Sequence, residues 1–231
     1  REILKSASLI RLMQAVTITV QGFPLLHLED KVSFALQCME DFDVQELAVV
    51  KEDYFLGIVQ KADLLDTDEA ATLMVLSDQL KKIMIADTAH FLTALDLFSK
   101  HQLSILPVLN EQLECIGMIP QKSLNDALAK FLGVDSPGAI IVLSVAPYQY
   151  SLAEMSRLVE SNNAQILQLN SYFDETNGAM IITLKINKDE AQTIIATFQR
   201  YDYQLVQYFG KTPLHNDIEA HYHHLMNYLD V

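Results

Sequence analysis

The chain has 231 residues, half of them hydrophobic, and a formal net charge of −14. This composition is typical of a globular protein with a substantial core, and the acidic surplus argues against nucleic acids and anionic membranes as partners. The apolar runs are far shorter than the roughly 20 residues that span a bilayer, and no secretory signal is visible, so we expect a cytoplasmic protein whose Cys38 and Cys115 are reduced, buried thiols.

We assign residues 1–20 to an N-terminal leader segment. The first twelve, REILKSASLIRL, contain three basic residues and one acidic residue. Two interpretations stay open for them: a native amphipathic helix, or a sequence added for expression.

An internal repeat organises the next part of the chain. The stretch FLGIVQKADLLD, residues 55–66, returns as CIGMIPQKSLND, residues 115–126. Helical and strand periodicity predicts a β-α-β-β-α unit for each copy, at residues 21–76 and 77–134. A unit of about 60 residues buries too little apolar surface alone, so we expect the two copies to share one core.

Apolar residues at helical spacing mark the first helix of each copy. The predicted buried face of the first is Val32, Leu36, Met39 and Phe42, and that of the second is Phe91, Leu95 and Phe98. Gly57 and Gly117 are expected where the second long strand of each copy approaches neighbouring backbone.

Two glycine phrases, GIVQKADLL at residues 57–65 and GMIPQKSL at residues 117–124, follow the apolar stretches LAVV and LPVL. On these residues, the range 21–133 resembles a CBS domain pair, also called a Bateman module. That resemblance implies a cleft between the halves that binds an adenosine-containing ligand. In this chain Asp63 matches the residue that accepts from the ribose hydroxyls, Gln60 stands where Ser or Thr helps with phosphate, and Lys61 lies beside it. The apolar residues implied to hold the base are Leu26, Ala48 and Val49.

The second copy departs from this pattern. Pro120 replaces the Ser or Thr, and Ser123 replaces the Asp. A neutral hydroxyl accepts more weakly than a carboxylate, and proline has no N–H to donate, so the second cleft is less suited to a ribose. Asp63 also has an alternative interpretation, as a residue that begins or caps the following helix.

Residues 135–210 have a different predicted order of strands and helices, β-α-β-β-α-β. Capping boxes are predicted at Ser151–Glu154 and Asn187–Glu190. This part resembles an ACT domain, and the whole chain is similar to the bacterial acetoin-utilisation type of CBS/ACT regulatory protein. The expected fold class is therefore α/β (α+β), a tandem CBS pair plus a ferredoxin-like βαββαβ domain.

The resemblance to ACT domains implies an amino-acid site after the first strand, often at a dimer interface. The bulky Pro147, Tyr148 and Tyr150 in that loop argue against such a site. A sheet used for packing and self-association is favoured instead, with the stretch AQILQL, residues 164–169, as an exposed edge strand of a homodimer.

Residues 211–231 are expected to form a C-terminal helix. An apolar stripe would dock it, formed by Ile218, Tyr222, Leu225 and Leu229. Its histidines are His215, His221, His223 and His224. A zinc site at His221 and His224 is the weaker alternative, because no carboxylate or thiol lies at suitable spacing, so no metal is predicted.

The sequence contains none of the GxSxG, HExxH or GxGxxG motifs. We therefore expect a protein that is not an enzyme and has no cofactor. Its predicted function is that of a regulatory module that senses a small metabolite, with an adenosine nucleotide as one candidate. The alternative is a self-associating scaffold whose ligand sites have lapsed.

Overall fold

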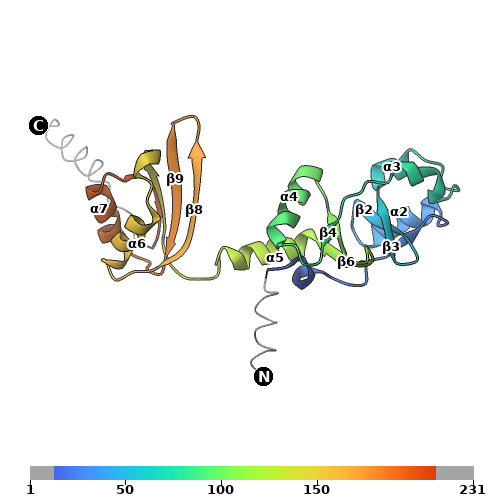
Figure 1. Cartoon of the computed structure of the whole chain (residues 1–231), viewed down its shortest axis with the longest axis horizontal. Helices are drawn as coiled ribbons and strands as arrows, with labels where there is room; N and C mark the ends of the chain where they lie inside the picture. Colours follow the sequence, from blue (N-terminus) through green and yellow to red (C-terminus); the bar gives the residue numbers. More distant parts are fainter. Residues whose placement is uncertain (1–12, 212–231) are drawn as a thin grey trace, which may run out of the picture. The chain divides into compact units, whose positions relative to one another are not determined.

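The computed structural model describes residues 13–211, drawn in colour in Figure 1. The chain divides into two compact units, the first ending at Ala129 and the second beginning at Lys130. Within residues 13–211, no helix combines the length and apolar character needed to cross a membrane.

The first unit contains the two copies of the repeat. The first copy consists of β1 (Leu26–His27), α2 (Val32–Asp41), β2 (Glu46–Lys51), β3 (Tyr54–Gln60) and α3 (Lys61–Leu65). The second consists of β4 (Ile85–Ala86), α4 (Phe91–His101), β5 (Ile105–Leu109), β6 (Cys115–Pro120) and α5 (Gln121–Phe131). The 3-10 helices η1 (Ala15–Ile18) and η2 (Leu73–Gln79) precede the copies. The predicted β-α-β-β-α order is confirmed in both.

The two three-stranded sheets have the same construction. Their strand orders are β1-β2-β3 and β4-β5-β6, with a short parallel pair followed by an antiparallel hairpin. Each hairpin contains a register shift, which falls after Val49 in one copy and after Val108 in the other. In both copies the residue left without a partner is the one just before the glycine, Leu56 or Ile116, so the repetition extends to backbone irregularities.

The helix faces agree with the prediction in part, with Leu36 and Leu95 half-buried and Phe42 exposed. Val32, Met39, Phe91 and Phe98 are buried as expected, whereas Phe42 is 45% exposed. Helix α2 ends at Asp41, so Phe42 is already its C-cap residue and packs against the Phe23 ring, 5.5 Å away between centroids. The small side chains Ala35 and Cys38 complete the buried face of α2 instead.

A single hydrophobic core runs through both copies, and crossed backbone pairing joins them. The amide of Ile58 in β3 donates to Lys81 O at 2.9 Å, and the amide of Lys81 donates back to Ile58 O at 3.1 Å. Met118 in β6 pairs in the same way with Val20. Each glycine-bearing strand thus pairs with the segment that precedes the other copy, and the expected common core is present.

Residues 13–20, which the sequence analysis assigns to a leader, are packed into this unit. Ala15 is fully buried, its amide donates to Ala89 O at 2.7 Å, and the amide of Phe91 donates to Met13 O at 2.9 Å. Residues around η2 pack against the first copy as residues 13–20 pack against the second, since the amide of Leu73 donates to Asp30 O. The repeated architecture therefore begins earlier than the sequence similarity does.

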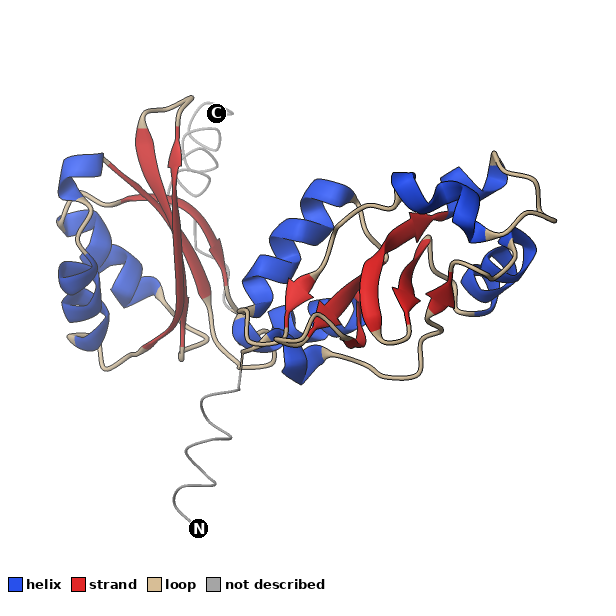
Figure 2. Ribbon diagram, turned by 45° about the vertical axis from the view of Figure 1, so that its right-hand side comes forward, coloured by secondary structure: helices blue, strands red, loops and turns tan. Residues whose placement is uncertain are grey.

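The second unit is a four-stranded antiparallel sheet covered by two helices on one face (Figure 2). Its elements are β7 (Ile140–Val145), the 3-10 turn η3 (Pro147–Gln149), α6 (Leu152–Glu160), β8 (Ile166–Asp174), β9 (Ala179–Ile186), α7 (Gln192–Arg200) and β10 (Gln204–Phe209). The strand order β10-β7-β9-β8 is that of a ferredoxin-like fold, as predicted, and β8 lies at an edge.

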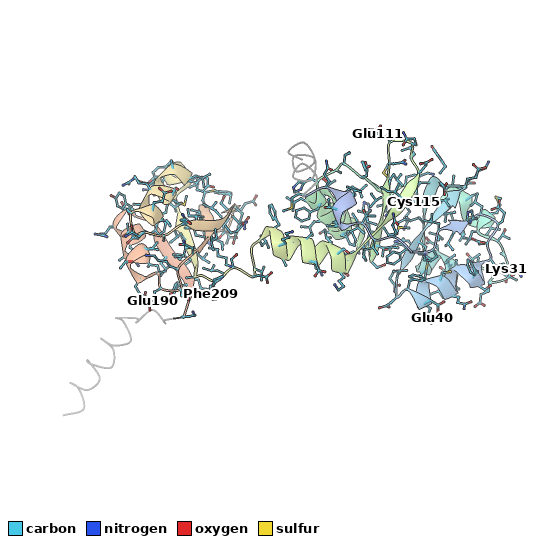
Figure 3. The ribbon with its side chains drawn as sticks, turned by 90° about the horizontal axis from the view of Figure 1, so that it is seen from below. Lys31, Glu40, Glu111, Cys115, Glu190 and Phe209 are labelled. Carbon is cyan, nitrogen blue, oxygen red and sulfur yellow. The ribbon has the colours of Figure 1, made fainter. Side chains whose placement is uncertain are left out.

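Of the two predicted capping boxes, the first is present as its Ser151 cap alone. The Ser151 hydroxyl accepts from the amide of Glu154 at the start of α6. The prediction for Asn187 and Glu190 is wrong: α7 begins at Gln192 without a side-chain cap, and Asn187 Oδ1 accepts from the amide of Gln165. This loop lies beside the end of β10, as the neighbouring labels of Glu190 and Phe209 show in Figure 3.

The two glycines of the repeated phrase have little room for a side chain. A Cβ on Gly57 would lie 2.8 Å from Leu80 Cβ, and one on Gly117 would lie 2.6 Å from Thr19 Cγ2, both at a φ of +154°. We therefore expect Gly57→Ala and Gly117→Ala each to lower the free energy of unfolding by about 1–3 kcal/mol. Urea unfolding followed by circular dichroism measures this change.

The control is Gly178→Asn, at a φ of +63° where a Cβ would meet nothing within 4 Å. Asn tolerates this conformation, so the change should be within about 0.5 kcal/mol. If Gly57→Ala and Gly117→Ala both had the same free energy of unfolding as wild type, the close backbone approach at these glycines would be contradicted.

Candidate functional site

The polar residues predicted for the first glycine phrase lie at the junction of β3 and α3. Gln60 ends the strand, Lys61 begins the helix, and Asp63 is in the first helical turn, all three half-buried. The amide of Lys61 donates to Gln45 O at 2.7 Å, which fixes the start of α3 against β2. Among the described residues, the Asp63 carboxylate has no hydrogen-bond or ion-pair partner, and α3 has no side-chain cap. The carboxylate is therefore free to accept from a ligand.

Two lysines that were not predicted as site residues bond to β3, Lys81 at the junction and Lys82 farther back along the strand. Lys81 Nζ donates to Gln60 Oε1, and Lys82 Nζ donates to Leu56 O. Both come from the segment between the copies, which is held against β3 by the Lys81 pairing described above. Both partners are neutral oxygens, so neither ammonium charge is paired by them, and of the two it is Lys81 that lies beside Gln60.

The apolar residues implied to hold a base are closed off. Leu26 of β1 pairs with Val49 of β2, and Ala48 is next to it. All three side chains are 0% exposed in the core. The structure therefore brings these three residues together, but they line no open space without a movement of the surrounding chain.

In the second copy the corresponding positions carry fewer polar groups. Ser123 lies in the first turn of α5, half-buried, and Pro120 ends β6 opposite Ile105. Lys122 forms an ion pair with Asp126 at 2.9 Å on the exposed side of α5. In the place that Lys81 has beside the first copy, the strand of the second copy pairs with the uncharged Val20.

A buried carboxylate lies at the seam where β2 and β5 meet. Glu46 is 1% exposed, and its Oε1 accepts from the Ser104 amide, from the Ser104 hydroxyl at 2.9 Å and from the Ile105 amide at 2.7 Å. Ser104 Oγ in turn accepts from the amide of Gln45 at 2.8 Å. These bonds connect the two copies through polar groups inside an otherwise apolar core.

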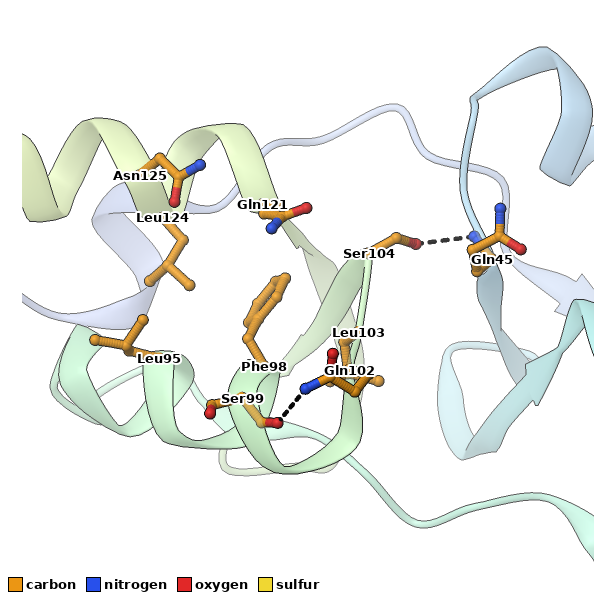
Figure 4. Close-up of a pocket in the computed structure, with 10 residues that line it drawn as sticks. All are labelled: Gln45, Leu95, Phe98, Ser99, Gln102, Leu103, Ser104, Gln121, Leu124 and Asn125. Carbon is orange, nitrogen blue, oxygen red and sulfur yellow. Dashed lines mark hydrogen bonds between the residues drawn. The ribbon is translucent and has the colours of Figure 1, made fainter.

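A cavity of about 450 Å³ opens beside this seam, between α4 and α5. Figure 4 shows Leu95 and Leu124 facing each other across it, with Phe98 between the helices and Ser104 at one end. The other lining residues are Gln45, Ser99, Gln102, Leu103, Gln121 and Asn125. None of the lining side chains carries a formal charge, although the protein as a whole is strongly acidic.

Residues 80–130 match the family model of the CBS domain. This range falls within the second copy of the repeat. Since the first copy has the same elements and register, the first unit has two CBS-pair-like sheets, and the second unit adds a further sheet. The fold is mixed α+β, as expected.

Several solved structures resemble the chain over about half of its length. One is a CBS domain pair/ACT domain protein from Thermotoga maritima, with 27% identity, 52% of this chain and 99% of that chain covered, and a TM-score of 0.48. Another is the cytosolic domain of the Mg²⁺ channel MgtE in complex with ATP, with 14% identity, 49% and 48% covered, and a TM-score of 0.43. A third is Hypoxic Response Protein I with two coordinated zinc ions, with 19% identity, 49% and 97% covered, and a TM-score of 0.42.

Cysteines and potential metal ligands are also candidate site residues. Burial raises the pKa of the Cys38 and Cys115 thiols, and Cys115 Sγ lies 3.7 Å from Gly117 O. Residues 13–211 contain no group of three or more His, Cys, Asp or Glu side chains that suits a metal ion. The predicted tail helix and its histidines, beyond residue 211, lie outside the described residues.

The loop after β7, where the resemblance to ACT domains implies a ligand, is bonded to its own unit. Tyr150 Oη lies 2.8 Å from Ser171 Oγ of β8, and Tyr148 is 87% exposed. Behind the loop, the Tyr203 hydroxyl donates to Glu154 Oε2 at 3.1 Å. Burial and the neighbouring Glu154 carboxylate raise the pKa of Tyr203 to about 12.

The Tyr203 shift predicts a loss of stability at high pH. An unfolded tyrosine ionises near pH 10, so the folded state holds a proton that the unfolded state has lost between about pH 10 and 12, and unfolding becomes easier as the pH rises through that window. Urea unfolding between about pH 9 and 11.5 should give a steeper decline for wild type than for Tyr203→Phe. Equal slopes in the two proteins would contradict this role.

Proposed function

We propose that the chain is a non-catalytic regulatory module that senses a small metabolite at the first glycine phrase. The observation that carries the proposal is the set of available polar groups there: the unpartnered Asp63 carboxylate, and the Lys81 ammonium group on a neutral partner. A carboxylate accepts two hydroxyl hydrogen bonds, and an ammonium group attracts a negatively charged group. An adenosine nucleotide has both features and is the leading candidate.

The finer points of the resemblance belong to the same proposal. We place the protein with the acetoin-utilisation type of CBS/ACT regulator, acting in the cytoplasm as a homodimer. Ligand binding would have to favour one arrangement of the module over another, because a ligand shifts an equilibrium only by its difference in affinity for the two states.

Binding tests with AMP, ATP, NAD and S-adenosylmethionine examine this function directly. We expect one of them to raise the unfolding temperature of the wild-type protein, and Asp63→Asn to weaken that ligand by about 10- to 100-fold, the effect of losing charge-assisted hydrogen bonds. Isothermal titration calorimetry measures the affinity. The matched control is Asp66→Asn, at an exposed position at the end of the same helix, which should bind as wild type does.

The variant Lys81→Met tests whether the lysine contacts the phosphate of the ligand while Asp63 contacts its hydroxyl groups. It should weaken AMP and ATP more than S-adenosylmethionine, which has no phosphate. The sensing function would be rejected if none of the four compounds changed the unfolding temperature, or if Asp63→Asn bound them as tightly as wild type.

A second function, that of a self-associating scaffold, is favoured by two specific observations. The residues implied to hold a base are fully buried, and β8 presents an unpaired edge with exposed Leu167, Tyr172 and Phe173. An exposed edge strand with apolar side chains is a template for pairing with a second chain.

Charged residues on the edge test the scaffold. Leu167→Lys/Tyr172→Lys should shift the protein from dimer toward monomer, because lysines on an edge disfavour strand addition. Sedimentation velocity measures the change. Leu152→Lys, at an exposed position on α6 of the same unit, is the control and should leave the distribution unchanged. An unaltered dimer in the double variant would exclude this edge as the interface.

A further inference from the structure

The seam of the CBS-like unit contains a set of hydrogen-bond donors that suits a bound oxyanion. Two backbone amides, of Ser104 and Ile105, and the Ser104 hydroxyl converge on a single oxygen atom, Oε1 of Glu46. The donors and the acceptor are 58 or 59 positions apart in the chain. Glu46 is the one charged side chain that is buried among residues 13–211. Burial of an ionised carboxylate is costly unless hydrogen bonds compensate, so these donors are what allow Glu46 to lie there.

The repeat shows that this arrangement is not a requirement of the fold. In the alignment of the copies, Gln45 corresponds to Ser104, and Glu46 corresponds to Ile105. The second copy therefore has an apolar residue where the first has its carboxylate, and the amide of Gln45 is satisfied by a neutral hydroxyl. Only one side of the seam has an anion, and the donors around it belong to the other copy.

One of the two donor residues, Ser104, lines an open space, whereas Ile105 does not. Ser104 lines the cavity of about 450 Å³ between α4 and α5, together with Gln45 and Gln121 (Figure 4). No charged side chain lines this cavity, so a small anion inside it would meet neutral amides and hydroxyls rather than a competing ion pair. The cavity lining contains none of Gln60, Lys61 or Asp63, although Gln45, which lines it, accepts from the Lys61 amide through its carbonyl oxygen.

We propose that Ser104 and Ile105 form an oxyanion site that Glu46 fills from the other copy, and that a carboxylate or phosphate ligand in the adjoining cavity competes with Glu46 for it. The Glu46 side chain thus acts as an internal inhibitor of anion binding. A ligand that displaces it breaks the polar connection between the copies, which gives the unit a second means of changing its arrangement.

Removal of the carboxylate should expose the site. In Glu46→Ala the three donors lose their partner, and we expect the unfolding temperature to fall by about 5–10 °C. Sodium formate, acetate or phosphate should restore part of this loss in a saturable manner, whereas sodium chloride at the same ionic strength should not. Formate and acetate test for a carboxylate ligand, and phosphate tests for a phosphate ligand. Wild type should show no saturable response to the same low concentrations.

Two further variants make the result specific. Glu46→Ala/Ser104→Ala lacks the hydroxyl donor, so rescue should require a higher anion concentration than in Glu46→Ala. Glu29→Ala removes an exposed carboxylate of the same unit and should show neither the loss nor the rescue.

If Glu46→Ala does not fold, Glu46→Gln provides the test, because it keeps the size of the side chain and one acceptor oxygen. Its neutral amide competes less well, so phosphate or acetate should bind more tightly to it than to wild type in a calorimetric titration. Equal effects of all salts, including chloride, on whichever variant folds would overturn the proposal. These readouts do not depend on Asp63 or on any adenosine compound, so their failure is distinguishable from failure of the proposed function.

Discussion

Neither copy of the repeat completes the edge of its own sheet, and this constraint governs the first unit. The strand with each glycine phrase pairs with the segment that precedes the other copy, Ile58 with Lys81 and Met118 with Val20. Glycine is needed where these backbones meet, and one apolar core passes through both copies. Because the pairing and the core are shared, we expect the copies to gain and lose stability together, since residues in one connected network do not contribute independently.

The shared seam also explains why the two copies differ in their polar residues. Packing requires apolar side chains and small glycines in both copies, and these are present in both. The polar groups are concentrated on the first copy, where Asp63 is free and Glu46 is buried, while the second has Ser123 and Ile105 at the equivalent positions. The second copy contributes backbone donors and the Ser104 hydroxyl instead. The first copy thus contributes the carboxylate acceptors, and the second copy contributes hydrogen-bond donors to Glu46.

Local patterns made the order of helices and strands predictable, whereas contacts between distant segments were not. Hydrophobic periodicity and the repeated phrase were sufficient for β-α-β-β-α twice and for β-α-β-β-α-β, because each element depends on its own residues. The approach of Lys81 to Gln60 and the packing of residues 13–20 depend on the crossed pairing, and the burial of Glu46 depends on Ser104 and Ile105 of the other copy. An acidic residue at the start of a strand is expected to be exposed, and only the donors of another segment make its burial possible. The same reason accounts for Asn187, whose side chain bonds to Gln165 rather than to its own helix.

The origin of each contact decides whether a ligand can alter the arrangement of the copies. Leu26, Ala48 and Val49 belong to one sheet of one copy, so contacts to them would be the same in any arrangement and would add affinity without coupling. Asp63 and Lys81 come from different segments, α3 and the connection between the copies, and a ligand that contacts both gains only where they lie together. The donors around Glu46 likewise come from the opposite copy. A difference in affinity between states is the requirement for a switch, and polar contacts to groups from different segments can supply it.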